Sequence, residues 1–264
     1  MISQNYNLQH YVNVFIMTKS GQYDTLVIGA GLGGLSVATS LSQNGHKVLV
    51  VEKNDKPGGN CIAFNKEGYR FDYALHQLNG AGNDGTLITE IFKEYGVNHL
   101  LNFKQVDPFM TIVMPDKEYH LASDWDQLQK DLIEYFPANE VEIKKFFKKI
   151  LHDYEDISLV QRILYGKNPV IRNVNHNISL KNKLTSPLRI PWLFARTVHT
   201  GNEYFKNMFS EPKLWALITA SWPYLGLPPS KVCGVMLGGF ISTEHHEKSY
   251  YPVGSSQTIT DVMV

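Results

Sequence analysis

DTLVIGAGLGG, residues 24–34, is the stretch that decides the fold. It opens with a short apolar run rich in β-branched residues, typical of a buried parallel strand, and runs straight into a glycine-rich segment. Small and apolar residues then recur at helical spacing over Leu35 to Asn44, and Gly45 stands where a helix commonly ends. A second apolar strand, Val48 to Val51, completes a predicted strand–helix–strand unit.

The glycine spacing in this unit is G-x-G-x-x-G, at Gly29, Gly31 and Gly34. Such glycines permit a tight turn, a close approach of backbone to a pyrophosphate, and close packing of helix on strand, while the helix N-terminus attracts the phosphates. Glu52 ends the second strand 21 residues beyond Gly31, where a carboxylate can accept hydrogen bonds from ribose hydroxyls. The pattern predicts a dinucleotide site rather than accidental turn glycines, and the acid disfavours the 2′-phosphate of NADP.

A Pro57-Gly58-Gly59 turn follows the second strand instead of a helix. It offers bare backbone along which a second part of a cofactor can pass. Together with the glycine loop and Val51-Glu52-Lys53, this turn resembles the FAD-binding flavoproteins that include amine oxidases and carotenoid desaturases.

Three further segments narrow the resemblance. Residues 68–76 (GYRFDYALH), 224–230 (YLGLPPS) and 250–256 (YYPVGSS) resemble signatures of the phytoene desaturase, carotenoid isomerase and retinol saturase group. The resemblance is strong over residues 23–80, patchy over 81–215, and recovers over 222–264. It implies an FAD-dependent oxidoreductase that acts on a polyene or isoprenoid lipid by hydride transfer with flavin N5.

The resemblance also implies which residues contact FAD. They are Gly29, Ala30, Gly31, Gly33, Gly34, Glu52, Lys53, Gly58, Gly59, Asn60 and His76. No catalytic residue is predicted, because the flavin carries the redox chemistry. For His76, a structural histidine bonded to backbone is the alternative.

The sequence departs from the group's pattern at three positions. Asn60 stands where many desaturases have arginine, Ala74 replaces a glycine, and Ser255 replaces the second glycine of the Tyr-Pro-x-Gly-Gly motif. These departures put a pyrophosphate-pairing cation, a close backbone approach to the flavin and the geometry of the last turn in question.

The middle of the chain is predicted to be mainly helical. Apolar spacing predicts two helices within Asp124 to Asp153, separated at Pro137, with Lys144, Lys145, Lys148 and Lys149 on a solvated face. From Pro187 to Phe209, aromatic and basic residues alternate, which suits either a peripheral membrane contact or the wall of a substrate domain.

These elements predict an α/β fold: a Rossmann-like FAD-binding domain with a parallel sheet, joined to a mixed, mainly helical substrate domain. The expected divisions are an extension over 1–22, the FAD-binding unit over 23–80, the substrate region over 81–250, and a return to the FAD domain over 251–264. We expect that this return is truncated at Val264, and that translation starts at Met1 or Met17.

Composition restricts the function further. The 264 residues are 43% apolar and 19% charged, with 25 basic and 25 acidic side chains, so no global basic field attracts nucleic acid. Cys61 and Cys233 are expected to be reduced thiols, and no metal site is expected, since His245-His246 reads as a solvated loop. With no secretory signal and no apolar run of about 20 residues, a cytoplasmic or peripherally membrane-associated location is expected.

Two alternatives remain open at this stage. One is another flavin oxidoreductase on the same fold, such as an amine oxidase. The other is a non-catalytic escort protein that binds prenylated partners, which the intact Gly29, Gly31, Gly34 and Glu52 disfavour.

Overall fold

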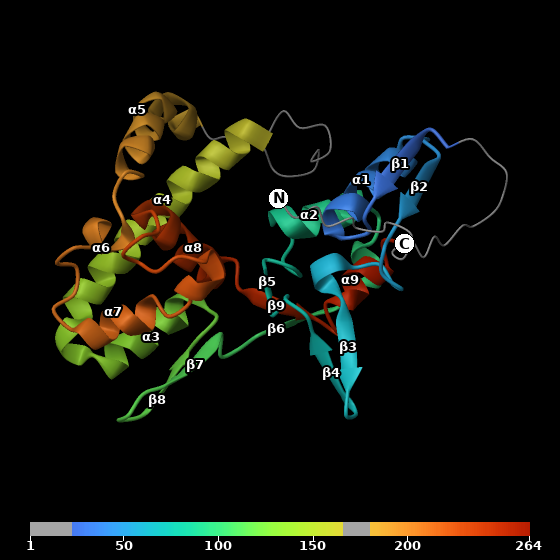
Figure 1. Cartoon of the computed structure of the whole chain (residues 1–264). Coiled ribbons are helices and arrows are strands. Elements are labelled where there is room, and N and C mark those ends of the chain that lie inside the picture. The colour runs from blue at the N-terminus through green and yellow to red at the C-terminus, as the bar shows by residue number, and fades with distance from the viewer. Residues whose placement is uncertain (1–22, 166–179) are drawn as a thin grey trace, which may run out of the picture. The chain divides into compact units, whose positions relative to one another are not determined.

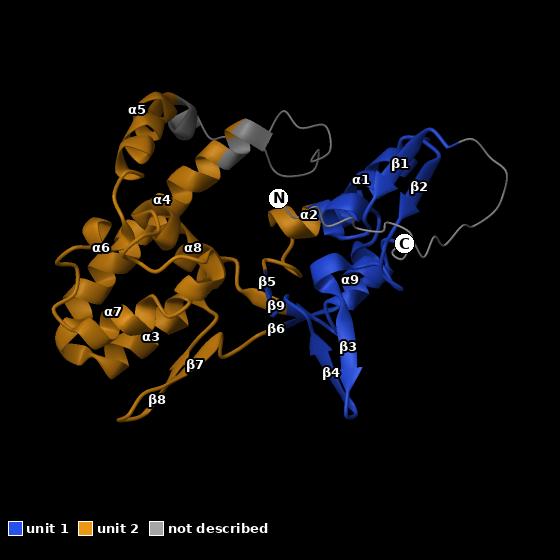
Figure 2. Ribbon diagram, viewed as in Figure 1, with its two compact units in different colours: residues 1–78, 91–104, 251–264 blue, residues 79–90, 105–250 orange. Residues whose placement is uncertain are grey.

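The computed structural model describes residues 23–165 and 180–264 (Figure 1). The predicted N-terminal extension and the choice between Met1 and Met17 lie outside the described residues. The chain divides into two compact units built from separate segments (Figure 2). Unit 1 takes residues up to 78, 91–104 and 251–264, and unit 2 takes residues 79–90 and 105–250.

Unit 1 opens with the predicted strand–helix–strand motif. Strand β1 (Thr25–Ile28), helix α1 (Leu32–Gln43) and strand β2 (Val48–Val51) follow one another, and β1 pairs with β2 in parallel, Thr25 opposite Val48. Helix α1 begins three residues earlier than the apolar spacing predicted, because the glycine loop itself enters the helix. The Rossmann-like start is therefore confirmed, but β1 is not the buried strand that its apolar sequence predicted, because Leu26 and Ile28 are 56% and 81% exposed.

The rest of unit 1 contains a hairpin and the last helix. Strand β3 (Ala63–Lys66) pairs antiparallel with β4 (Tyr69–Asp72), and α9 spans Gln257–Asp261. The hairpin turn has Glu67 at φ 53° and Gly68 at φ 82°, the backbone that a two-residue turn between antiparallel strands favours.

Four elements carry the chain across the division between the units. They are β5 (Leu78–Asn79), α2 (Leu87–Glu94), β6 (Phe103–Gln105) and β9 (Ser249–Pro252). Strand β9 lies between β5 and β6 in a three-stranded sheet.

Unit 2 is mainly helical, as predicted. Its hairpin is β7 (Met110–Val113) with β8 (Glu118–Leu121), and its helices are α3 (Trp125–Tyr135), α4 (Glu140–Tyr165), α5 (Leu180–Arg196), α6 (Gly201–Tyr204), α7 (Pro212–Ile218) and α8 (Gly234–His246). Asp124 caps α3 by accepting hydrogen bonds from two backbone N–H groups, and a short 3₁₀ turn at Pro137–Asn139 separates α3 from α4, as Pro137 predicted.

A hydrophobic core fills unit 2. Leu132, Ile143, Phe146 and Ile150 are almost completely buried and form the apolar stripe that the sequence placed on α3 and α4. Apolar spacing also predicted Val141 on the buried side of the second helix, but this residue, in the first turn of α4, is 79% exposed.

Glycines allow α8 to pack closely against its neighbours. A Cβ atom added at Gly234 would lie 2.2 Å from Cβ of Tyr204 in α6, and one at Gly239 would lie 2.3 Å from Cδ1 of Ile157 in α4. The short approach explains how a helix of low intrinsic propensity is stable: tertiary packing compensates for the glycines.

Candidate functional site

The glycine loop of unit 1 presents an open helix N-terminus. Gly29 has φ 97°, which favours glycine, and Gly31 precedes α1 with no side chain capping the first turn. No acidic residue belongs to that turn. The arrangement suits a phosphate group.

The third glycine of the motif is required by packing. A Cβ atom at Gly34 would lie 1.9 Å from the carbonyl oxygen of Gly29. At Gly33, by contrast, a Cβ atom would meet nothing within 4 Å. Packing therefore requires glycine at position 34, whereas position 33 has room for a side chain.

The Pro-Gly-Gly turn lies directly against this loop. The N–H of Gly58 donates to the carbonyl of Ala30 at 2.8 Å, and a Cβ atom at Gly59 would lie 3.0 Å from Cα of Gly31. Gly58 and Gly59 also have positive φ values of 138° and 56°. Two segments that the sequence separates by more than 20 residues thus form one backbone cradle, as a cofactor passing from one to the other requires.

Glu52 faces the same cradle. Its Oε2 atom accepts a hydrogen bond from the N–H of Ala30 at 2.6 Å, and Oε1 accepts one from Asn54 at 3.0 Å. The bond from Asn54 is the largest cause that lowers the pKa of the carboxyl, so the group is anionic at neutral pH. A carboxylate offers about four acceptor positions, so these two bonds leave room for hydroxyl donors.

Asp72 joins the two ends of unit 1. Its carboxylate accepts hydrogen bonds from Tyr251 Oη, from the N–H of Ser256 at 2.9 Å and from Oγ of Ser256 at 2.7 Å. Partial burial acts to raise the pKa of Asp72, but these hydrogen bonds outweigh it and hold the pKa below its ordinary value. The Phe-Asp segment and the Tyr-Pro-x-Gly segment, quoted separately as signatures, therefore meet at one carboxylate.

Gln257 extends this connection to the Pro-Gly-Gly turn. Its Nε2 atom donates to the carbonyl of Pro57 at 2.7 Å, and its Oε1 atom accepts from the N–H of Ala63 at 3.3 Å. Sequence reasoning missed Gln257, because an isolated glutamine after a motif carries no pattern; the signal was its place directly behind the Tyr-Pro-x-Gly signature.

The remaining predicted contact residues lie at the surface of unit 1. Lys53, Asn60 and His76 are exposed, as is Ala74. Their contacts with a cofactor stay predictions. Ser255 is different: it is 1% exposed, has φ 156°, and its hydroxyl has no hydrogen-bond partner.

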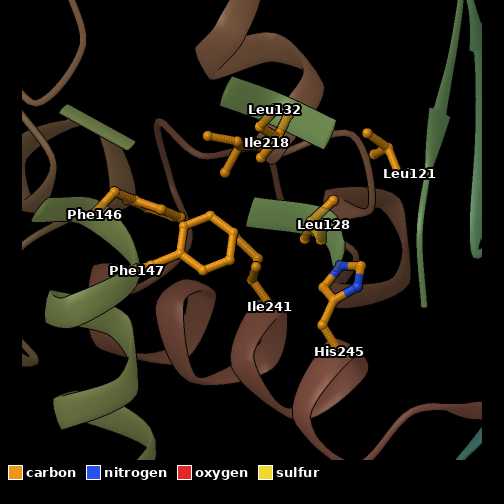
Figure 3. Close-up of a pocket in the computed structure, with 8 residues that line it drawn as sticks. All are labelled: Leu121, Leu128, Leu132, Phe146, Phe147, Ile218, Ile241 and His245. Carbon is orange, nitrogen blue, oxygen red and sulfur yellow. The ribbon is translucent and has the colours of Figure 1, made fainter. Parts of the chain in front are cut away.

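In unit 2, one cavity lies within the hydrophobic core (Figure 3). Its lining comprises Leu121, Leu128, Leu132, Phe146, Phe147, Ile218, Ile241 and His245. Its volume of about 10 Å³ holds at most one water molecule, so this cavity is no substrate tunnel.

The prediction of a solvated loop at His245-His246 was wrong. Both histidines belong to the last turn of α8, and His245 is 4% exposed, with Nδ1 2.9 Å from the carbonyl oxygen of Ala122. Burial lowers the pKa of His245 to about 4. Across residues 23–165 and 180–264, no group of three or more His, Cys, Asp or Glu side chains is placed to hold a metal ion.

Comparison with known protein families identifies the class of the N-terminal part of the chain. Residues 27–95 match the family described as "NAD(P)-binding Rossmann-like domain". The geometry of the cradle and this match together define unit 1 as a Rossmann-like dinucleotide-binding unit.

The relatives then place the chain more closely. It is 26% identical to all-trans-retinol 13,14-reductase of Rattus norvegicus over 250 residues. This aligned region covers 89% of this chain and 38% of that protein. It is 31% identical over 134 residues to chloroplastic prolycopene isomerase 2 of an Oncidium hybrid cultivar, covering 50% of this chain and 22% of that protein. The predicted resemblance to the retinol saturase and carotenoid isomerase group is confirmed, and the chain spans less than half the length of these relatives.

The fold has a counterpart among solved structures. A redesigned putrescine oxidase superposes with a TM-score of 0.56 at 16% identity, covering 92% of this chain and 48% of that one. At this identity the likeness concerns the fold alone. Within the described residues, no helix combines the length and apolarity needed to cross a membrane.

Proposed function

We propose that this chain provides the ADP-binding part of an FAD site in an oxidoreductase that acts on a polyene or isoprenoid lipid. The observation that carries the proposal is the convergence in unit 1 of the glycine loop, the Pro-Gly-Gly turn, Glu52 and the Asp72 anchor. Similarity to a retinol reductase over 89% of the chain supports the substrate class.

The described residues fit such a cofactor. The pyrophosphate would lie against Gly31 and the uncapped start of α1. Glycine at position 59 leaves this place open, because a Cβ atom there would lie 3.0 Å from Cα of Gly31. Glu52 would accept from the ribose hydroxyls with its remaining lone pairs, as an anion that repels a 2′-phosphate.

When bound, flavin supplies hydride transfer at N5. The described residues would bind and orient the cofactor. Asp72 accepts hydrogen bonds from Tyr251 and Ser256, and Gln257 donates one to Pro57, so the Pro-Gly-Gly turn is held in its position against the glycine loop. No acid or base is assigned to the reaction, in keeping with chemistry that resides in the cofactor.

A binding experiment tests the cofactor. FAD binding to the purified chain is measured by titration calorimetry, with ADP and NADP⁺ as competitors. We expect that ADP competes, that NADP⁺ competes at least about tenfold more weakly, and that Glu52→Gln weakens FAD binding by at least about tenfold, since one charge-assisted hydrogen bond contributes about 1.5–3 kcal/mol. Glu67→Gln, at the exposed hairpin turn of the same unit, is the matched control. Failure of ADP to compete would contradict the assignment.

A panel assay tests the substrate class. Protein carrying flavin is offered retinoids, carotenoids and primary amines, and flavin absorbance is followed without oxygen. Bleaching or product formation with polyenes alone supports the proposal. Oxidation of amines alone would instead assign an amine oxidase, and a flavin-free protein that binds prenylated peptides would assign an escort.

A further inference from the structure

Helix α9 contacts the Pro-Gly-Gly turn through one buried side chain. Gln257 is 4% exposed, and its Nε2 atom donates to the carbonyl of Pro57 at 2.7 Å. A Cβ atom added at Gly58 would lie 3.2 Å from the same Nε2 atom. The turn also contacts the glycine loop, since the N–H of Gly58 donates to the carbonyl of Ala30 at 2.8 Å. The turn is therefore held by both the loop and Gln257.

Other residues of unit 1 fix the amide of Gln257. Its Nε2 atom also donates to Oγ1 of Thr260 at 3.1 Å and to Oδ1 of Asp261 at 3.0 Å, and its Oε1 atom accepts from the N–H of Ala63 at 3.3 Å. Both polar atoms of the amide therefore have partners besides the bond to Pro57. These partners hold the amide in one orientation, so it presents a fixed donor to the turn.

The turn needs this support because glycine makes it intrinsically flexible. Gly58 and Gly59 have φ values of 138° and 56°, and a residue without Cβ has the greatest backbone freedom in the unfolded chain. Glycine is nevertheless required at position 59 by the close approach to Gly31. A flexible turn that must stay close to the glycine loop depends on contacts from outside itself. Gln257 makes such a contact from 200 residues further along the chain.

The position of the turn indicates which part of a nucleotide it meets. In the proposed site, Glu52 and the glycine loop would hold the ribose and the first phosphate, and the cofactor would then pass the turn. In the part of the chain that the structure describes, the N–H groups of Gly59 and Asn60 donate to no protein acceptor. The turn therefore offers donors to a second phosphate, whereas a nucleoside monophosphate would end before it.

We propose that Gln257 is a positioning residue for the second phosphate of the bound nucleotide. Through Pro57 it holds the backbone of Gly58 and Gly59 against Gly31, so that a pyrophosphate meets a preformed turn. A residue of the last helix thereby favours nucleoside diphosphates and dinucleotides over nucleoside monophosphates. Gln257 acts through the turn and not by touching a phosphate. The inference rests on the proposed function, because the preference exists only in a cradle that binds a nucleotide.

Titration calorimetry with ADP and AMP, which differ by one phosphate, tests the proposal. Gln257→Met keeps the length of the side chain and removes its hydrogen bonds. We expect the ratio of ADP affinity to AMP affinity to fall by at least about fivefold in this variant, because ADP must then order a turn that is no longer preformed. Gln43→Met is the matched control. Gln43 is exposed at the end of α1 and donates to the carbonyl of Glu94 at 3.1 Å, so its replacement should leave the ratio unchanged.

The affinity ratio separates positioning from general destabilisation, because a partly unfolded unit 1 would lose affinity for AMP and ADP alike. Circular dichroism shows whether each variant is folded. If Gln257→Met does not fold, Thr260→Val decides: it removes one acceptor of the Gln257 amide with little change of shape, and we expect the ratio to fall by at least about twofold.

Two results would overturn the proposal and leave the cofactor site intact. They are an unchanged ratio in the folded Gln257 or Thr260 variant, and an equal fall in Gln43→Met. Wild-type protein that binds neither nucleotide would instead contradict the proposed FAD site, and this inference with it.

Discussion

Ser255 has a glycine-favoured backbone and a buried, unpartnered hydroxyl. Both features cost free energy: a non-glycine residue in a sparsely populated region costs about 1–3 kcal/mol, and an unsatisfied buried hydroxyl about as much. Ser255→Gly removes both costs. The greater entropy of glycine in the unfolded chain offsets part of this gain, so we expect the free energy of unfolding to rise by a net of about 1 kcal/mol in urea denaturation.

Ser256→Ala provides the contrast. It removes the hydrogen bond from Ser256 Oγ to Asp72 and should lower the free energy of unfolding by about 1–2 kcal/mol. If Ser255→Gly instead lowers the free energy of unfolding, the backbone conformation and buried hydroxyl of Ser255 do not destabilise the folded chain.

The buried Glu244 and His245 make contributions to the free energy of unfolding that change in opposite directions as pH rises. Burial raises the pKa of Glu244 to about 8 and lowers that of His245 to about 4. Stability from protonated Glu244 is complete below its unfolded pKa of 4.5 and is lost as pH rises through 8. Stability from neutral His245 is complete above its unfolded pKa of 6.5 and is lost as pH falls through 4.

Glu244→Gln separates the two effects. Glutamine retains an oxygen to accept from Ser221 but has no charge to develop, so the variant should match the wild type near pH 4.5 and exceed it at pH 8 by on the order of 3 kcal/mol. Urea denaturation across this range measures it. An advantage that does not grow with pH would show that Glu244 is ionised in the folded chain.

At the scale of elements, the contact between α1 and β1 depends on one glycine of an adjacent pair. Gly34→Ala places a methyl group against the Gly29 carbonyl, so we expect a loss of at least about 1–3 kcal/mol in the free energy of unfolding. Gly33→Ala places its methyl group in open space on the same helix and should stabilise by up to about 1 kcal/mol. Equal effects from both substitutions would contradict this packing.

The attachment of α5 is a second test at this scale. Arg196→Ala leaves Asp153 and Asp156 buried with fewer partners, and we expect a loss of about 3–5 kcal/mol together with faster proteolysis within α5. Lys144→Ala removes an exposed pair with Glu140 and should change stability by less than about 1 kcal/mol. Unchanged proteolysis in the Arg196 variant would show that apolar contacts hold α5.

Helix α8 shows what element-level prediction missed. Gly234, Gly238 and Gly239 lower its helix propensity, and the polar Glu244-His245-His246 end resembles a loop. The helix exists because those glycines let it pack on α4 and α6, a reason that lies in other parts of the chain. Helix α3 was predictable because its cap, its period and the proline after it are all local.

At the scale of the whole molecule, the two units differ in how they are stabilised. The buried hydrophobic cluster belongs to unit 2, whereas in unit 1 Leu26 and Ile28 of β1 are 56% and 81% exposed. We therefore expect unit 1 to unfold at lower urea concentration than unit 2, because less apolar surface is buried in it.

Ligand binding should change this order selectively. ADP or FAD at 100 times its dissociation constant should stabilise the folded form that binds it by about 2.7 kcal/mol. In hydrogen exchange, the added protection should fall on residues 29–34 and 57–61 and leave α4 and α8 unchanged. Equal protection of both units would place the ligand elsewhere.

The sequence by itself determined the strand–helix–strand start, the glycine cradle's members, the break between α3 and α4 at Pro137, and the resemblance to a group of relatives. Each of these depends on residues close together along the chain, where spacing and propensity act directly. Only the tertiary structure decided that Asp72 joins Ser256, that Gln257 supports the Pro-Gly-Gly turn, that Glu244 and His245 are buried, and that α5 turns its apolar side outward. These depend on partners far away along the chain or on which face of a helix finds a neighbour, and no local pattern encodes either.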